Sequence, residues 1–251
     1  MIKVLDKTFG ILEEIVKATP HPVGPLALAN RLGLNRATCS RILKMLLDSG
    51  YILKVSRQAG YVAGPRILTL ASMAGYQSEL LRRAVPVVDR TAEATLGAVL
   101  ISQVHAGERY VLYLGNRIPD RVIKLADLSF DDVFNTATGV VEAAYMDEAE
   151  RLALFDAAAG RGRAVLSDFR DREKLSAVCA RIRREKFYHC PKGELGIFAA
   201  PVFSGRCFVA ALGCSITRER YAGGGIAATA KTVSAAAAEL SAALSSIGSV
   251  G

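Results

Sequence analysis

Apolar residues near the start of the chain recur at the three- and four-residue spacing of amphipathic helices. Residues 2–17 follow this spacing, and prolines and a glycine between positions 20 and 24 end it. Pro25 suits the first turn of a second helix, and Gly33 suits its C-terminal end. Asn35 is a good N-cap for a third helix that reaches about Ser49. Two short helices joined by so tight a turn predict a helix-turn-helix.

The third predicted helix has two chemically different faces. One is an apolar stripe, formed by Cys39, Ile42, Leu43, Leu46 and Leu47. The other face and the N-terminal tip carry small, hydroxyl-bearing and cationic residues: Arg36, Ala37, Thr38, Ser40, Arg41 and Lys44. Arginine forks onto guanine, small residues permit close approach and lysine contacts phosphate, so this face suits a major groove. An ordinary amphipathic surface helix is the alternative.

A predicted β-hairpin follows directly after the helix-turn-helix. Residues 51–56 and 61–63 have strand character, and residues 57–60 form the turn between them. A hairpin at this place is the wing of a winged helix, and Arg57 at its tip can contact the DNA backbone or minor groove. Alternatively the hairpin only supports the helices, and Arg57 is solvated.

The remainder of the chain predicts hairpins flanked by helices. A linker helix covers residues 65–83, Pro86 interrupts the helical pattern, and residues 87–94 resume as helix. The further predicted elements are hairpins at 98–104 with 109–114 and at 196–203 with 207–216, and helices at 138–145, 147–159, 171–187 and 222–247. This mixture predicts an α+β fold with an antiparallel sheet. We expect domains at 1–64 and 84–251, joined by the linker helix at 65–83.

Composition narrows the class of protein. The chain has 251 residues, 51% hydrophobic and 22% charged, which is enough apolar material to bury a core. No apolar run approaches the roughly 20 residues that cross a bilayer, and the first residues lack the pattern of a signal peptide. Five scattered cysteines are an odd number and fit reduced thiols. We therefore expect a soluble, cytoplasmic protein without a membrane partner.

Positive charge is concentrated at the N-terminal end. The chain carries 32 basic and 24 acidic residues, a net charge of +8. Nine basic and four acidic residues lie within 1–64, which places +5 there and +3 on the rest. A small basic module favours a polyanionic partner such as nucleic acid, although a merely solvated basic surface has the same charge.

Motifs of catalysis are weak in this chain. His189 beside Cys190 suggests a thiol–imidazole pair, but neighbours on an extended segment point to opposite sides. Both residues together with Cys207 could instead form a zinc site, for which inert thiols are the simpler interpretation. Nucleophile-elbow, phosphate-loop and dinucleotide motifs are missing from the sequence. We therefore expect no enzyme, no catalytic residue, no cofactor and no metal site.

Taken in order, several segments resemble the IclR family of bacterial transcriptional regulators. They are Gly33–Leu43, Leu46 with Gly50-Tyr51, Tyr61–Gly64, Thr136–Gly139, Phe198–Phe203 and Ala210–Ile216. The resemblance implies a winged helix on operator DNA, a GAF-like effector-binding domain, and assembly into homodimers or homotetramers. It also implies a small, carboxylate-bearing effector.

By the same resemblance, the effector lies between a helix-opening turn and two strands. The implied residues are Ile123, Leu125, Ala137, Thr138, Gly139, Gly213 and Ser215. A turn that opens a helix offers backbone N–H groups and a positive dipole end to an anion, and Ser215 adds a hydroxyl. Alternatively, Gly139 only begins a helix and Ser215 only ends a buried strand.

The chain departs from the family pattern at two places. Val140 stands where the family usually has a basic residue, and residues 190–194 carry Lys192 and a single carboxylate where the family has an acidic pair. We expect a ligand-responsive repressor or activator of a metabolic operon. The main alternative is a winged-helix protein whose second domain only oligomerises or binds a protein partner.

Overall fold

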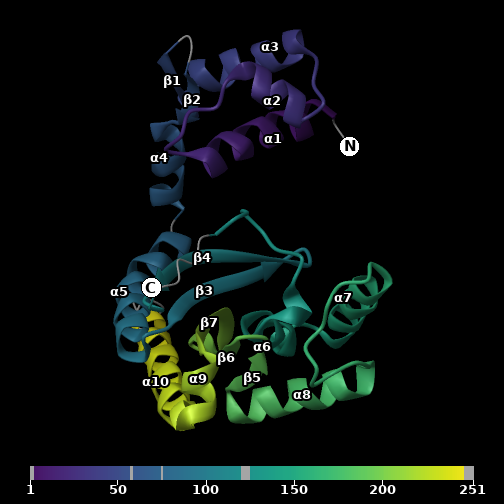
Figure 1. Ribbon diagram of the computed structural model, residues 1–251, viewed down its shortest axis with the longest axis vertical. Coiled ribbons are helices and arrows are strands. Elements are labelled where there is room, and N and C mark those ends of the chain that lie inside the picture. Colours follow the sequence, from purple (N-terminus) through teal and green to yellow (C-terminus); the bar gives the residue numbers. More distant parts are fainter. Residues whose placement is uncertain (1–2, 57–58, 75, 120–124, 246–251) are drawn as a thin grey trace. The chain divides into compact units, whose positions relative to one another are not determined.

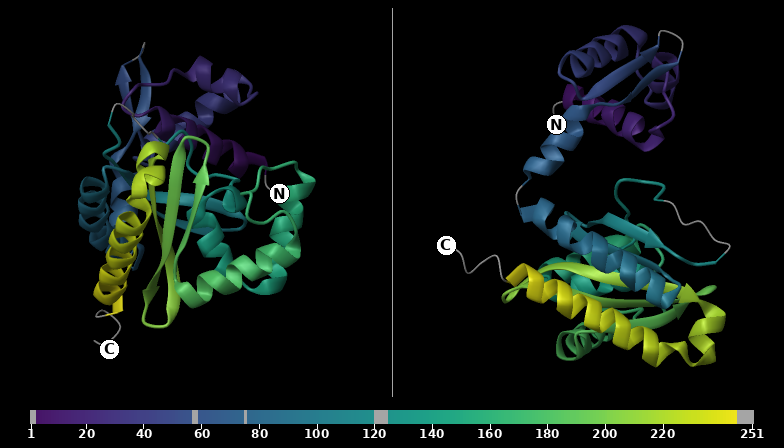
Figure 2. Two further views of the ribbon diagram at one scale, coloured as in Figure 1. Left: turned by 60° about the horizontal axis from the view of Figure 1, so that its bottom comes forward. Right: turned by 90° about the vertical axis from the view of Figure 1, so that its left-hand side faces the viewer.

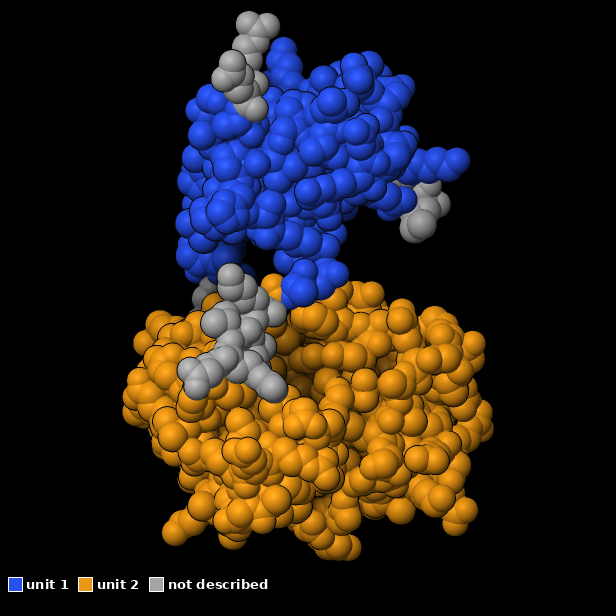
Figure 3. Space-filling view, viewed as in Figure 1, with its two compact units in different colours: residues 1–78, 126–128 blue, residues 79–125, 129–251 orange. Residues whose placement is uncertain are grey.

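The computed structural model describes residues 3–56, 59–74, 76–119 and 125–245. The chain divides into two compact units, shown in different colours in Figure 3. Unit 1 contains residues 1–78 with 126–128, and unit 2 contains residues 79–125 with 129–251.

Unit 1 contains the predicted helix-turn-helix and wing (Figure 1). Its elements are α1 (Lys3–Ala18), α2 (Pro25–Arg31), α3 (Arg36–Asp48), β1 (Ile52–Ser56), β2 (Gly60–Ala63) and α4 (Pro65–Met73). Ile15, Leu28 and Leu43 lie fully buried in one cluster, because each apolar stripe turns toward the other two helices. The helices predicted from residues 2, 25 and 36 are confirmed within one residue of their starts.

The wing is a two-stranded antiparallel hairpin that is tied to the helices. Ile52 pairs with Ala63, and Tyr61 also forms a bridge with Val23 in the segment before α2. Gly60 has a φ of +105°, and a Cβ there would lie 2.2 Å from the Val23 carbonyl oxygen. Only glycine fits this close approach. Arg57, the predicted tip residue, lies outside the described residues.

Unit 2 is built on a five-stranded antiparallel sheet in the order β4-β3-β7-β6-β5. The strands are β3 (Ala98–His105), β4 (Glu108–Asn116), β5 (Tyr188–Lys192), β6 (Leu195–Ser204) and β7 (Cys207–Thr217). Both predicted hairpins are confirmed as β3–β4 and β6–β7. The edge strand β5 was missed, because its five residues include a proline and a lysine rather than a β-branched run.

Helices cover both faces of this sheet (Figures 1 and 2). On one face lie α5 (Tyr76–Thr95) and α10 (Ile226–Ser245); on the other lie the 3₁₀ helix η1 (Val133–Asn135), α6 (Ala137–Tyr145), α7 (Glu148–Gly160) and α8 (Arg172–Glu185). Along β6, Phe198 and Ala200 pack toward α10, whereas Ile197 and Ala199 pack toward α6. This alternation is the period of two expected for a strand between two layers.

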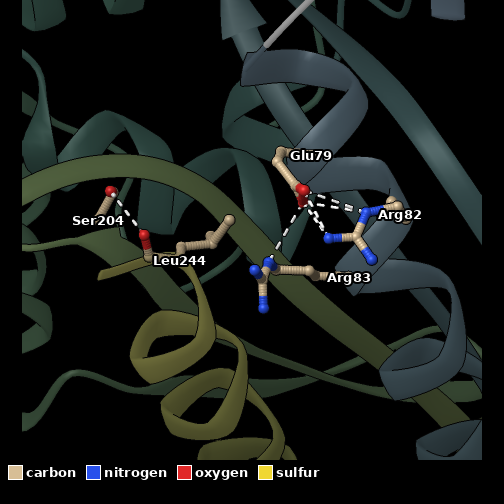
Figure 4. Close-up of polar contacts among 5 residues, drawn as sticks. All are labelled: Glu79, Arg82, Arg83, Ser204 and Leu244. Atoms are coloured by element: carbon tan, nitrogen blue, oxygen red, sulfur yellow. Dashed lines mark hydrogen bonds and ion pairs between the residues drawn. The ribbon is translucent and has the colours of Figure 1, made fainter. Parts of the chain in front are cut away.

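Helix α5 runs through Pro86, so the predicted interruption at this proline is wrong. Leu80 and Ala84 before the proline and Val87 and Val88 after it are all buried in the same core. Burial of apolar side chains on both sides offsets the cost of about 3 kcal/mol that an internal proline imposes. Near the start of α5, the Glu79 carboxylate accepts hydrogen bonds from Arg82 and Arg83 (Figure 4).

The last helix begins later than the sequence predicts. Arg218–Arg220 (α9) and a π-helical turn at Tyr221–Gly225 (η2) precede α10, and Gly224 there has a φ of +88°. The glycine triplet is therefore a bend between two helical pieces. No helix among the described residues is long and apolar enough to cross a bilayer.

Candidate nucleic-acid interface and ligand pocket

The two predicted faces of α3 are confirmed by burial. Cys39, Ile42, Leu43 and Leu46 are buried. On the other side, Arg36, Ala37, Ser40, Arg41 and Lys44 are exposed and Thr38 is half-buried. Ion pairs of Arg36, Arg41 or Lys44 are absent from the part of the chain that the structure describes. The cations on this face are therefore available to a partner.

The N-terminal start of α3 is set by its own sequence. Asn35 has an extended backbone, and its side-chain oxygen accepts a hydrogen bond of 2.8 Å from the Thr38 N–H. This is the predicted N-cap, and it satisfies one of the free donors of the first turn. The Cys39 thiol approaches the Pro25 carbonyl oxygen at 3.7 Å and so joins α3 to α2. The cap and the packing hold the exposed face in a defined position.

Unit 2 contains a pocket of about 200 Å³ between the start of α6 and the sheet. Its walls come from β3, β4, β5, β6 and β7 and from the residues that open α6. The lining residues are Leu100, Arg109, Thr136, Ala137, Thr138, Lys192, Leu195, Ile197, Phe198, Gly213, Cys214 and Ser215. The pocket combines an apolar floor with two cations and several hydroxyls.

Four of the seven predicted effector residues line this pocket: Ala137, Thr138, Gly213 and Ser215. Gly139 is adjacent but does not line it; a Cβ there would lie 2.2 Å from the Val133 carbonyl oxygen, so its role is close packing against η1. Leu125 is 46% exposed and does not line the pocket. Ile123 lies outside the described residues.

Gly213 lets α6 pack closely against β7. A Cβ at this position would lie 2.4 Å from Thr138 Cγ2, closer than any real contact allows. Its next neighbours, the Phe198 carbonyl oxygen and Leu100 Cδ1, would stand at 3.5 and 3.7 Å, which are ordinary contacts. The threonine methyl group is therefore the single steric reason for glycine in this strand.

The backbone donors that open α6 are partly used by the protein itself. Thr136 is the N-cap, and its hydroxyl oxygen accepts a hydrogen bond of 3.2 Å from the Gly139 N–H. Of the N–H groups that the turn was expected to offer to an anion, that of Gly139 is therefore occupied by the cap. The N–H groups of Ala137 and Thr138, the first two residues of the helix, have no intrahelical acceptor.

Sequence reasoning missed both cations of the pocket. Arg109 is 6% exposed and forms a bidentate ion pair with Asp132, at 2.8 and 2.7 Å. Its remaining nitrogen, Nη1, is buried and finds no acceptor among the described residues. Lys192 Nζ donates to the Asn135 carbonyl oxygen at 2.5 Å, and burial lowers the pKa of this lysine. For Lys192, the departure from the family pattern at this position was a sign in the sequence that could have been used. For Arg109, an arginine near the end of a predicted strand, the sequence contained no such sign.

A buried carboxyl group lies behind these cations. Glu142 of α6 is 3% exposed, and its Oε1 accepts a hydrogen bond of 2.6 Å from the Ser102 hydroxyl. Burial raises the pKa of Glu142 to about 8, although Ser102 and Arg109 act in the opposite direction. At pH 7 this group is mostly neutral, so Asp132 is the only carboxylate facing Arg109 and Lys192 within the described cluster. Two cations against one anion favour a ligand with a negative charge.

The cysteine–histidine motif does not form an acid–base pair. On β5, Cys190 is buried and His189 is exposed, on opposite sides as the alternation predicts. His189 Nδ1 lies 3.0 Å from the Tyr221 hydroxyl oxygen, and burial raises the pKa of the Cys190 thiol. Cys207 is exposed. Among the described residues, no three His, Cys, Asp or Glu side chains gather as metal ligands.

Comparison with known proteins agrees with this geometry. A family model described as winged helix-turn-helix DNA-binding matches residues 5–52. No curated protein sequence matches the chain. Three similar solved structures are all IclR proteins.

The first is an IclR homologue from Microbacterium hydrocarbonoxydans in complex with 4-hydroxybenzoate, with a TM-score of 0.78 at 16% identity over 97% of this chain and 99% of that one. The second is an IclR transcriptional regulator from Alicyclobacillus acidocaldarius. It has a TM-score of 0.74 and 18% identity, and the match covers 97% of this chain and 99% of that one. The third is IclR of Thermotoga maritima. It has a TM-score of 0.67 and 16% identity, and the match covers 98% of this chain and 100% of that one. At these identities the likeness establishes the fold, which is that of the two-part IclR-type regulators.

Proposed function

We propose that the chain is an IclR-type transcriptional regulator that binds operator DNA through unit 1 and a small carboxylate-bearing metabolite through unit 2. The observation that carries this proposal is the exposed, cationic and hydroxyl-bearing face of α3, opposite an apolar stripe of which four residues are buried. The match of residues 5–52 to winged helix-turn-helix DNA-binding domains supports it.

The residues of α3 divide by the chemistry of their side chains. Arg36 and Arg41 suit guanine edges, Thr38 and Ser40 suit close contact with bases, and Ala37 suits a thymine methyl group. Lys44 lies about two turns from the N-terminal end of α3 and suits contact with a phosphate group. We expect Arg57 of the wing to contact the backbone as well.

A homodimer is the form of the regulator that we expect on DNA. Several large apolar side chains of α1 and α4 are exposed, among them Phe9 at 58%, Leu68 at 74% and Met73 at 77%. Helix α4 has no buried residue within the described chain, so its apolar side is uncovered in a single copy. A dimer would place two α3 helices about one turn of DNA apart, and a homotetramer would pair two such dimers.

The pocket of unit 2 suits a small acid. A carboxylate can accept from the buried Nη1 of Arg109, from Lys192 and from the N–H groups that open α6, while the apolar floor holds the rest. The complex of the Microbacterium homologue with 4-hydroxybenzoate supports this ligand class. A ligand that binds one arrangement of the dimer more tightly changes its DNA affinity, as a repressor or an activator requires.

The experiment combines ligand binding with DNA binding. Thermal shift with 4-hydroxybenzoate and a panel of small aliphatic acids should raise the melting temperature for at least one acid. That acid should change the affinity for the DNA upstream of the gene, measured by fluorescence anisotropy, and Lys192→Gln should weaken the response. If DNA binds but no acid has any effect, the second unit serves oligomerisation or a protein partner instead.

A further inference from the structure

A second cavity of unit 2 lies outside the predicted effector site and has a volume of about 630 Å³. We call it the α10 groove; its walls include Tyr145, Arg183, Lys186, Phe203, Arg206 and Ala238. It shares no lining residue with the smaller pocket at the start of α6. Its volume falls in the range of cavities that hold drug-sized ligands.

The groove exists because β6 extends past β5. The β5–β6 ladder ends where Tyr188 meets Ala199, whereas β6 continues with β7 as far as Ser204. Helix α8 ends at Glu185, and Lys186 follows in the left-handed region with a φ of 53°. Residues 200–203 of β6 therefore have no strand partner on the β5 side, and Ala200, Pro201 and Phe203 line the groove.

Hydrogen bonds from α10 close this strand edge to further strands. The Phe203 N–H donates to Ser241 Oγ at 3.0 Å, and Pro201 has no N–H. Beyond them, the Ser204 hydroxyl donates to the Leu244 carbonyl oxygen (Figure 4), and the Gly205 N–H donates to Ser245 Oγ. With these N–H donors missing or occupied, an added peptide strand would find few donors along this edge, so the edge does not favour β-augmentation.

Three cations surround the apolar interior of the groove. Arg183 donates to the Ala144 carbonyl oxygen at 2.8 Å, Lys186 Nζ lies 5.7 Å from the Phe203 ring centre, and Arg206 is in the β6–β7 turn. None of the three forms an ion pair with a carboxylate in the described parts of the chain, and the carboxylate of Glu185 is paired with Arg184. Glu185 also lines the groove, so three cations stand against one carboxylate there and the lining has an excess of positive charge.

A rigid aromatic group forms one wall. Tyr145 stacks on Phe208 with ring centres 4.8 Å apart, and Phe203 meets Tyr145 edge to face at 5.3 Å. The small side chains of Ala237 and Ala238 on α10 line another side. A flat apolar body can lie against these walls while an acidic group reaches the cations.

We propose that the α10 groove is a second ligand site, which binds an amphipathic small-molecule anion with an aromatic or alicyclic body and a carboxylate or sulfonate group. This site is independent of the effector pocket and of DNA binding. The larger volume admits bulkier acids than the pocket at α6 can take.

The test uses anilinonaphthalene sulfonate, a fluorescent aromatic anion, titrated into the full-length protein. We expect one saturable, blue-shifted site per chain, displaced by naphthoate and not by neutral naphthamide. The double variant Lys186→Gln/Arg206→Gln should weaken dye binding at least about tenfold, because it removes roughly two charge-assisted contacts. Ala238→Phe, at an exposed position that lines the groove, should abolish it without removing charge.

Two matched controls distinguish binding in the groove from general charge attraction and from binding in the effector pocket. Arg170→Gln/Arg181→Gln removes two exposed charges of unit 2 outside the groove, and Lys192→Gln alters the effector pocket; both should leave the titration unchanged. Dye binding that survives Ala238→Phe, falls equally in the charge control, or is not saturable would overturn the proposal. A change of oligomeric state in Ala238→Phe, measured by sedimentation, would also overturn it, because the groove would then be an interface between copies.

Discussion

Arg41 is exposed on the side of α3 opposite to the buried stripe, where an arginine can form two hydrogen bonds with one guanine. We predict that Arg41→Ala weakens binding to cognate DNA by about 1–3 kcal/mol and binding to random DNA by much less. The control is Arg31→Ala, which removes the same charge from α2, where the arginine pairs with Glu14 at 3.2 Å. Competition anisotropy measures both affinities. Equal losses on both DNAs would make Arg41 a backbone contact.

Glu142 gives unit 2 a characteristic pH dependence. Its pKa is about 8 in the fold and near 4.5 when unfolded, so between these values the folded chain holds more protons. Its contribution to stability is therefore lost as pH rises through this window, with a slope of up to about 1.4 kcal/mol per pH unit. Urea unfolding from pH 5 to 8 should show that Glu142→Gln removes this part of the slope. Parallel curves for the two proteins would contradict the assignment.

Lys192 should distinguish acids from their neutral analogues. Lys192 lines the pocket, and burial lowers its pKa because the charged ammonium group loses contact with water. A ligand carboxylate would replace those lost water contacts with an ion pair. We expect Lys192→Gln to reduce affinity for an acid that binds this pocket about tenfold or more, and to change binding of the matching amide little. Isothermal titration calorimetry with the acid identified by thermal shift measures the difference. The same loss for acid and amide would indicate a structural role for Lys192.

At the scale of elements, the contact between α6 and β7 depends on a glycine and a methyl group. We predict that Gly213→Ala destabilises unit 2 by about 1–3 kcal/mol, because its Cβ would lie 2.4 Å from Thr138 Cγ2. The double variant Gly213→Ala/Thr138→Ser removes that methyl group and should recover most of the loss. Chemical unfolding of the single and double variants measures this. No recovery would mean that the strand, and not the contact, requires glycine.

Elements with a strong local signal could be predicted from the sequence. The spacing of apolar residues and the Asn35 cap defined α3, and alternating strands around short turns defined both hairpins. The path of α5 through Pro86 could not be predicted, because burial on the sheet decides it and not local preference. Arg109 pairs with Asp132, a residue far from it in the sequence. No local sequence pattern could therefore predict that Arg109 is one of the pocket's two cations.

At the scale of the whole molecule, the proposal requires that the basic face of unit 1 governs attraction to DNA. Each phosphate contact adds about 0.9 to the slope of log affinity against log salt. Affinity for the DNA upstream of the gene should therefore fall steeply as salt increases, and a bound acid should shift the whole curve while leaving its slope similar.

The most direct measurement compares this protein with Arg36→Ala/Arg41→Ala/Lys44→Ala on the upstream DNA fragment in dilute salt. All three side chains are exposed, so the variant should stay folded, which circular dichroism can verify. The account predicts tight, sequence-selective binding by the unaltered chain. For the triple variant it predicts loss of selectivity and a slope of log affinity against log salt that is smaller by about 0.9, because Lys44 is the one of the three assigned to phosphate. Failure of the unaltered chain to bind duplex DNA, or full binding by the folded variant, would contradict it.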